Sequence, residues 1–464
     1  MEMLGERMEN PLLAPDPMLS SNDLLPRRYP RLQPAEGTCT QDSPLLSLPS
    51  ELIHDILSYV SCVGLAAVAC TCRCLNIHAM NDLLWAKRVN SYISYEIHDP
   101  SPYDSFYDLY VAHHPFWFLA KNKIWFADAA HTGRLLMTRY DHRTGTIEGY
   151  RVVVTLGRRN FIASPRNPEV MIHTFNPTVR LWLDDPLIQL EKPPVSTGRQ
   201  NARHHNWRGG EIPMRIAEHS QGVFNSFVLS PKATYGETEG KTYEEVPPHR
   251  QARLWPPPTI PSDHRIDRHA PDHYLWEHKP LKLSSICESG FRTRRWVQFR
   301  SFVPIIEGSP TNGVGESMET FATIKPELYT PTQEKPYQGI WVGDYAGNGC
   351  EFLLFTQPDD PVLDTDEDDV DSSSAFAAYD HRRNSSSSSA ASSHSQADST
   401  PPKRQRLDAI KLTGDPNVPR GEISFRAKDI GPESALRIAD EPMFQGARVV
   451  SGEGHVASRN FQNG

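Results

Sequence analysis

The sequence lacks the features that define several common classes of protein. No stretch approaches the ~20 consecutive apolar residues of a membrane-spanning helix, and the longest apolar run near the start is Val63–Cys70. Residues 1–42 are rich in proline and charge and lack the continuous apolar core of a secretory signal. The seven cysteines are irregularly spaced, which argues against a secreted disulfide scaffold. We therefore expect a soluble intracellular protein, cytoplasmic, nuclear or both, without membrane association.

Signatures of nucleic-acid binding are also missing. The net charge is -9, and the run Asp359–Asp371 contains eight acidic residues and no basic one. Removing this run leaves about -1 for the rest of the chain (-9 minus -8). A near-neutral remainder does not provide the basic face of a nucleic-acid-binding protein. The basic residues 401–406 form either a nuclear import signal or an ordinary basic stretch of a disordered loop.

The chain contains none of the common sequence motifs of catalysis or metal binding. There is no glycine-rich phosphate loop and no Gly-x-Ser-x-Gly sequence. Cys70, Cys72 and Cys74 alternate instead of forming the spaced pairs of a zinc site, and no matching second pair follows. We therefore predict no catalytic residue, no bound metal and no cofactor.

A helical pattern occupies residues 43–92. Apolar residues recur at helical spacing in three short segments, at Leu52, Ile53, Ile56, Leu57 and Val60, then Leu65, Val68, Cys72 and Leu75, then Leu83, Leu84 and Trp85. Pro49 suits the first position of the first helix, which places Leu48 at the cap, where an apolar side chain cannot accept a hydrogen bond. These helices either pack on the rest of the chain or complete their core against another protein.

Strand patterns dominate the chain from about Phe116 onward. A turn signal at Asp141–Gly145 separates two strand-like runs and predicts a hairpin. Similar runs return near residues 337–357 and 409–430, on either side of the low-complexity block 358–408. We expect these two strand regions to be neighbours in one sheet, because lengthening a surface loop costs little free energy.

The pattern as a whole predicts an α+β protein. A disordered arm, residues 1–42, precedes the helices of 43–92, and a mainly antiparallel β-barrel domain covers 93–464. Two long insertions interrupt this domain, a Pro/His-rich region at 191–280 and an acidic, serine-rich loop at 358–408. Both have compositions typical of disordered segments.

The helical segment resembles an F-box. Its landmarks occur in order: Leu48-Pro49, the amphipathic helix, Cys72-Arg73 and Leu84-Trp85. The resemblance implies docking onto the Skp adaptor and, through it, onto a cullin–RING ubiquitin ligase. The implied adaptor-binding residues are Leu48, Pro49, Ile53, Ile56, Leu57, Leu75 and Trp85. The alternative for Leu48 is a hydrophobic staple against Ile53 within the chain.

Residues 337–357 and 409–461 are similar to segments of the F-box only protein 31 type of substrate receptor, in which a β-barrel follows the F-box. Glycine-rich turns at Asp344–Tyr345 and Asp415–Asn417 are surrounded by aromatic and charged residues. We predict that a protein substrate with a short degron binds there, at Trp341, Asp344, Tyr345, Glu351, Lys411 and Arg426. Alternatively, the aromatic residues are ordinary barrel core and the charged residues are merely solvated.

These observations predict a non-catalytic substrate-recognition subunit of a Skp–cullin–F-box ligase, which marks its client for proteasomal degradation. One alternative is a barrel that binds a small molecule, whose F-box serves regulation or turnover of the protein itself. Another is an enzyme active site inside the barrel.

Overall fold

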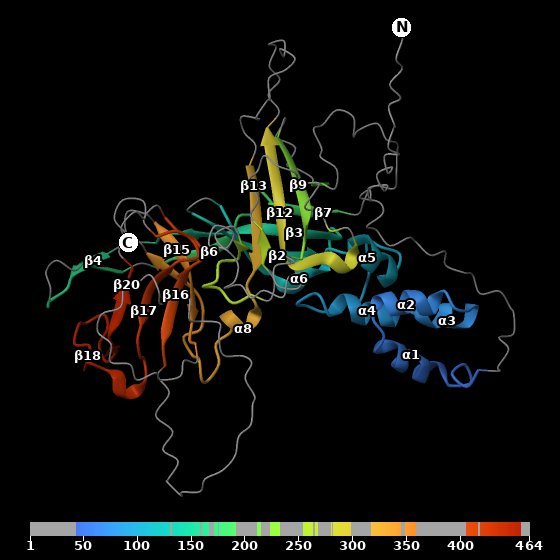
Figure 1. The fold of residues 1–464 in the computed structure, drawn as a ribbon, viewed down its shortest axis with the longest axis horizontal. Helices are drawn as coiled ribbons and strands as arrows, with labels where there is room; N and C mark the ends of the chain where they lie inside the picture. The colour runs from blue at the N-terminus through green and yellow to red at the C-terminus, as the bar shows by residue number, and fades with distance from the viewer. Residues whose placement is uncertain are drawn as a thin grey trace, which may run out of the picture.

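The computed structural model places helices at one end of the molecule and β-sheets over the rest (Figure 1). The structure describes residues 43–129, 132–157, 160–166, 171–174, 176–191, 211–214, 223–232, 254–262, 265–267, 280, 282–297, 317–344, 349–358, 405–415 and 418–455. The predicted disordered arm 1–42 and most of both predicted insertions lie outside these residues.

Four short helices form the N-terminal region where the sequence predicted three. They are α1 (Ser50–Ser58), α2 (Cys62–Ala69), α3 (Arg73–Ala79) and α4 (Asp82–Asn90). The predicted second helix is divided because Cys72 has an extended backbone and caps α3, its Sγ accepting a hydrogen bond from the Leu75 N–H at 3.4 Å. Ser61 and Asn81 cap α2 and α4 in the same way.

Two further helices lie at the start of the region predicted to be a β-barrel domain, and the second occupies the position at which the strand pattern was expected to begin. They are α5 (Phe106–His113) and α6 (Trp117–Asn122). The first four residues of α6 are all buried, namely Trp117, Phe118, Leu119 and Ala120, so the first turn of this helix is apolar on every side. A short, continuously apolar run has no helical period, which is why the sequence alone did not distinguish it from a buried strand.

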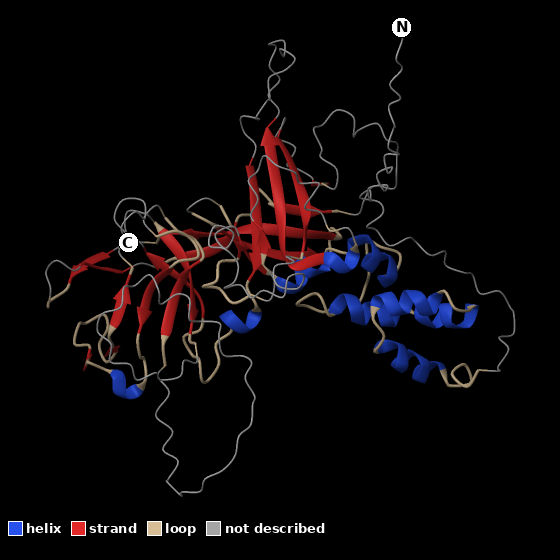
Figure 2. Ribbon diagram, viewed as in Figure 1, coloured by secondary structure: helices blue, strands red, loops and turns tan. Residues whose placement is uncertain are grey.

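The β region confirms the predicted fold class, a mainly antiparallel sheet structure after a small helical region, with the main sheet curled into half of a barrel (Figure 2). The nine-stranded sheet has the order β6-β3-β2-β1-β13-β12-β9-β8, and β7 also pairs with β3. Its strands are β1 (Ile124–Ala127), β2 (Arg134–Asp141), β3 (Thr146–Thr155), β6 (Thr178–Leu181), β7 (Ile188–Leu190), β8 (Ile212–Met214), β9 (Val223–Pro231), β12 (Ile286–Val297) and β13 (Ser317–Thr323).

A second sheet of five strands has the order β14-β15-β16-β17-β20. A short helix, α8 (Pro326–Tyr329), leads into it from β13. The strands are β14 (Gly339–Asp344), β15 (Cys350–Thr356), β16 (Leu407–Lys411), β17 (Ile423–Ala427) and β20 (Gly452–Gly454). The small pairs are β4 (Asn160–Ala163) with β5 (Met171–Thr174), β10 (Leu254–Trp255) with β11 (Ile266–Asp267), and β18 (Arg437–Ile438) with β19 (Arg448–Val449).

Two pairings predicted from the sequence are confirmed. β2 and β3 form the hairpin around Asp141–Gly145, with Tyr140 opposite Ile147. β15 and β16 are neighbours, with Leu354 opposite Ile410, although residues 357–406 separate them in the sequence. The two strands bury apolar residues on the same face, and the free energy gained by this pairing compensates for the entropy lost in closing the loop between them.

A segment within the predicted Pro/His-rich insertion is part of the core. Trp255, Ile260 and Ile266 belong to the apolar cluster that joins the two sheets, together with Phe126 and Phe352. The Trp255 ring lies 4.7 Å from the Phe126 ring. Residues 254–262 therefore fill the space between the sheets, a role that the proline-rich composition concealed.

The helices and the nine-stranded sheet share one core. A single apolar cluster runs from Ile53 and Trp85 through Trp117 to Phe291 and Phe321 of the sheet. Trp85 lies 5.1 Å from Tyr110, and Trp117 lies 5.5 Å from Tyr140, measured between ring centroids. The helices thus pack on the rest of the chain, which is the first of the two alternatives that the sequence left open.

Buried polar groups complete this junction. The His113 ring nitrogen Nε2 lies 2.9 Å from both the Tyr103 hydroxyl and the Gly145 carbonyl oxygen. Burial lowers the pKa of His113 from 6.5 to about 4, and the Gly145 carbonyl opposes part of the shift. Burial likewise raises the pKa of Tyr103 to about 12. Both side chains are therefore neutral at physiological pH.

The pKa of His113 predicts acid sensitivity. The unfolded chain takes up a proton near pH 6.5, whereas the folded chain does so only near pH 4, so protonation favours unfolding. The contribution of His113 to the free energy of unfolding should be constant above this window and fall by roughly 3 kcal/mol from pH 6.5 to 4, at about 1.4 kcal/mol per pKa unit. Denaturant titrations across this range should show less of this decline in His113→Gln than in the wild type. An identical decline in both proteins would contradict the assignment.

Candidate functional site

The predicted adaptor-binding residues divide into buried and accessible side chains. Ile53, Leu57 and Trp85 lie in the shared core, and the Trp85 indole N–H donates to the Ala79 carbonyl at 2.9 Å. These three residues hold the helices together. Leu48 and Leu75 are half-buried, and Pro49 and Ile56 are exposed.

Helix α1 begins one residue later than predicted. Pro49 is the cap, and no side chain caps the helix there. The N–H groups of Leu52 and Ile53 bond to the Pro49 carbonyl. Leu48 packs against the apolar cluster that contains Ile53, and these two positions, before the cap and four residues after it, are those of a hydrophobic staple. A staple and an adaptor contact are compatible, because Leu48 is only half-buried.

Several large apolar side chains of the helical region point to solvent. Leu52 and Ile56 are 51% and 45% exposed and lie one turn apart on α1. The remaining exposed apolar side chains of this region are Leu45, Tyr59, Val63, Ile77 and Leu83. The amphipathic pattern included Leu52, but only the structure shows that part of the apolar stripe remains outside the core. Of these residues, Leu52 and Ile56 are neighbours on one helix face, whereas single exposed apolar side chains are common on protein surfaces.

The predicted substrate-binding residues lie on both faces of the five-stranded sheet. Trp341, Glu351 and Lys411 share the outer face, because Trp341 and Lys411 both stand opposite Leu353 in the register, and Glu351 lies two residues from it. Asp344 and Arg426 fall on the inner face by the same alternation. Tyr345, like Pro416 and Asn417 of the second turn, lies outside the described residues.

Lys411 is completely buried within an ion cluster. Its Nζ atom lies 2.8 Å from Oε2 of Glu351 and also contacts the Asp415 carboxylate. Asp415 accepts a hydrogen bond from the Val418 N–H at 3.1 Å. Lys411 and Glu351 therefore fix the position of Asp415, and neither presents its charge to solvent. Arg426 is also paired, with its Nε atom 2.7 Å from Oδ1 of Asp408.

An aromatic row crosses the outer face beside this cluster. Trp341 stacks on Phe355 at 5.4 Å, and Phe355 meets Phe425 edge-on at 5.5 Å. Trp341 is 46% exposed, and Phe425 is 37% exposed. Sequence reasoning missed Phe355 and Phe425. Once the pairing of the strands is known, strand alternation places both residues on the same face as Trp341.

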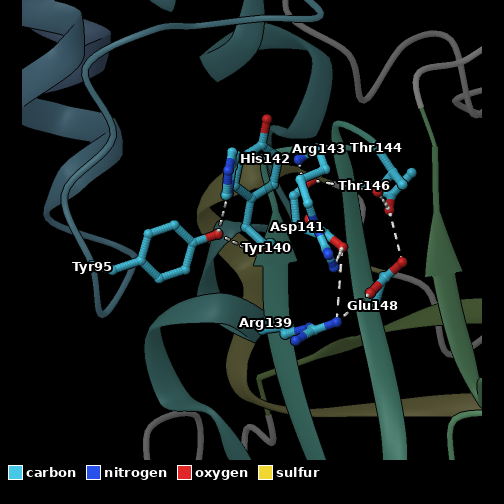
Figure 3. Close-up of polar contacts among 9 residues, drawn as sticks. All are labelled: Tyr95, Arg139, Tyr140, Asp141, His142, Arg143, Thr144, Thr146 and Glu148. Atoms are coloured by element: carbon cyan, nitrogen blue, oxygen red, sulfur yellow. Dashed lines mark hydrogen bonds and ion pairs between the residues drawn. The ribbon is translucent and has the colours of Figure 1, made fainter.

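A polar cluster at the β2–β3 turn joins the helices to the sheet (Figure 3). Tyr95, which follows α4, donates its hydroxyl to the Tyr140 carbonyl. Arg143 binds Asp141 through two nitrogens, at 3.0 and 2.8 Å, and lowers the pKa of that carboxyl. Arg139 lies 3.4 Å from the Glu148 carboxylate. These charges neutralise one another, and the cluster fixes the turn against the Tyr95 segment.

The described part of the chain offers no group of three or more side chains that could hold a metal ion. None of its helices is both long and apolar enough to span a bilayer.

Comparison with known families identifies the two ends of the chain. Residues 45–91 match the F-box-like family and form an F-box-like domain. Residues 321–464 match the family described as the Cyclin D1 binding domain. Comparison with the curated proteins gave no match. The first match covers α1–α4, and the second begins in β13 and includes the whole five-stranded sheet.

The ion cluster around Lys411 yields a stability prediction. Lys411→Met should lower the free energy of unfolding by about 3–5 kcal/mol, because it leaves the buried Glu351 and Asp415 carboxylates without their ammonium partner. The matched control is Lys428→Met, since Lys428 pairs with Glu453 at 2.7 Å in the same sheet but both side chains are 61% exposed. The control should change stability by at most about 1 kcal/mol. Equal effects of the two substitutions in chemical denaturation would refute the structural role of Lys411.

Proposed function

We propose that this chain is the substrate-recognition subunit of a Skp–cullin–F-box ubiquitin ligase, of the F-box only protein 31 type. The observation that carries the proposal is the order of its two matched regions on one shared body: an F-box-like domain first and a Cyclin D1 binding domain last. In this arrangement the chain has no catalytic step of its own. It holds a client near the ligase, which raises the effective concentration of the client's lysines at the transfer site.

The F-box-like domain docks the Skp adaptor through its accessible apolar residues. Pro49, Ile56 and the exposed part of Leu48 supply the contact, with Leu52 beside them on α1. The buried Ile53, Leu57 and Trp85 contribute indirectly, by holding α1 and α4 in place. This division explains why the apolar Leu48 precedes the Pro49 cap. No polar side chain caps the helix there, and Leu48 instead packs within the chain and contacts the adaptor.

Adaptor capture tests this assignment. Ile56→Asp should abolish capture of the Skp adaptor in a pull-down with the full chain, because it places a charge at the centre of an apolar contact. The melting temperature should stay close to that of the wild type, since Ile56 is already 45% exposed. Leu436→Asp introduces the same charge at a 71% exposed leucine of the C-terminal region and serves as the control. Undiminished capture by Ile56→Asp would reject the proposed face.

The outer face of the five-stranded sheet binds the client. Trp341 leads this surface, together with Phe425. Tyr345, which follows β14 in the sequence, is a further contact that we propose from the sequence alone. Glu351 and Lys411 support this surface from within the sheet through their contact with each other and that of Lys411 with Asp415, whereas Asp344 and Arg426 lie on the other face of the same sheet. The family description makes cyclin D1 the first client to test.

Trp341→Ala should weaken client binding by roughly 30-fold, because truncation of an interface hot spot costs about 2 kcal/mol or more. Binding of cyclin D1 to the purified chain with its adaptor measures this effect, and adaptor binding should be unaltered. Phe444→Ala provides a matched control, since Phe444 is an aromatic residue with the same 46% exposure outside the sheet. Client affinity that is equal in both variants would contradict a role for the aromatic row.

The two alternative functions receive less support. Among the described residues, the space between the two sheets is filled by Phe126, Trp255, Phe352 and their neighbours. No observation on this part of the chain favours a small-molecule site or an enzyme active site. Localisation to the cytoplasm or the nucleus stays a prediction. The sequence feature that bears on it is the basic run 401–406, of which residues 401–404 lie outside the described residues.

A further inference from the structure

β14 lies at the edge of the five-stranded sheet. Within the described chain its only strand partner is β15, with which it pairs from Gly339–Phe355 to Asp344–Cys350. An edge strand presents unpaired backbone groups on its outer side and is a template for a further strand.

The register shows which backbone groups of β14 point outward. The Leu412 N–H donates to the Phe352 carbonyl at 2.9 Å, so Phe352 directs its backbone groups toward β16. By the alternation of antiparallel pairs, Leu353 directs its groups toward β14 and bonds with Trp341. Ile340 and Val342 therefore point their N–H and C=O groups away from the sheet. These groups have no hydrogen-bond partner among the described residues.

The sequence of this edge does not protect it. Residues 339–344 contain neither lysine nor proline, the residues that usually block strand addition. Helix α8 covers only the entrance of the strand, where the Gln338 side chain donates to the carbonyls of Glu327 and Thr330. Ile340 and Val342 are half-exposed. At the opposite edge, β20 has only three residues, and the charged Glu453 occupies its centre.

We propose that an extended client segment adds to β14 as a sixth strand of this sheet. The inference rests on the proposed function and specifies how the client is recognised. Backbone hydrogen bonds to Ile340 and Val342 provide affinity that is independent of client sequence, and side chains provide selectivity. Alternate client residues fall on the outer face beside Trp341, so this position selects a large apolar side chain.

Amide hydrogen exchange on the full chain tests the proposal. The probe is a linear peptide selected on the purified protein from a display library of short peptides. In the free chain the Ile340 and Val342 amides should exchange quickly, while the Trp341 and Gly343 amides are protected by β15. Bound peptide should slow exchange at Ile340 and Val342 and leave the other two unchanged. Protection of Ile340 and Val342 without peptide would overturn the proposal, because the edge would then already be covered.

Two proline variants and a modified peptide complete the test. Val342→Pro removes one outward N–H and should weaken peptide binding at least tenfold. Gly454→Pro removes an outward N–H from β20, where an added side chain would meet no atom within 4 Å, and should have no effect. N-methylation of alternate peptide residues should reproduce the loss, whereas methylation of the intervening residues should not.

Two further results would overturn the proposal: a library that yields no binder, or binders indifferent to both Val342→Pro and N-methylation. Adaptor capture and client ubiquitination by the same preparations report on the proposed function separately. If both persist, only the mode of client recognition is wrong.

Discussion

The structure depends on the aromatic junction between the helices and the nine-stranded sheet. Trp85, Tyr110, Trp117 and Tyr140 pack in succession, so the helix that closes the F-box-like domain is linked by ring contacts to the hairpin of β2 and β3. Large aromatic side chains bury the most apolar area per residue and lose little conformational entropy in doing so. A short helical domain that would be marginal alone thereby gains a core from its neighbour.

The junction has a consequence for function. Ile53, Leu57 and Trp85 are committed to internal packing, and this leaves Leu52 and Ile56 on the accessible side of the same helix. At the other end, the five-stranded sheet packs its inner face, with Phe352, Leu354 and Ile410, against the nine-stranded sheet. Its outer face retains Trp341 and Phe425. Each end of the molecule therefore has one face packed into the core and large apolar side chains partly exposed on the other face.

Much of this arrangement could be predicted from the sequence. The F-box landmarks, the β2–β3 hairpin and the pairing of β15 with β16 all follow from local patterns and turn signals.

The burial and orientation of individual side chains could not be predicted in this way. Trp85 stands at a conspicuous position in the motif yet is buried. Its burial could not be predicted, because the α5 helix that covers it has no recognisable helical period in the sequence. Asp344 and Arg426 were grouped with Trp341 because each lies near one of the two glycine-rich turns in the sequence, whereas strand alternation places them on the opposite face. The buried Lys411 could not be distinguished from a solvated lysine until its two carboxylate partners were located.

Ubiquitin transfer in a reconstituted ligase tests the central claim most directly. The assay combines the full chain with the Skp adaptor, the cullin–RING core and its ubiquitin-loading enzymes, and it follows modification of cyclin D1. We predict that modification requires this chain and fails with the chain in which the apolar face of α1 or the aromatic row is disrupted. If the chain assembles with the adaptor and binds cyclin D1, but modification proceeds at the same rate without it, the account of this protein as a substrate receptor is contradicted.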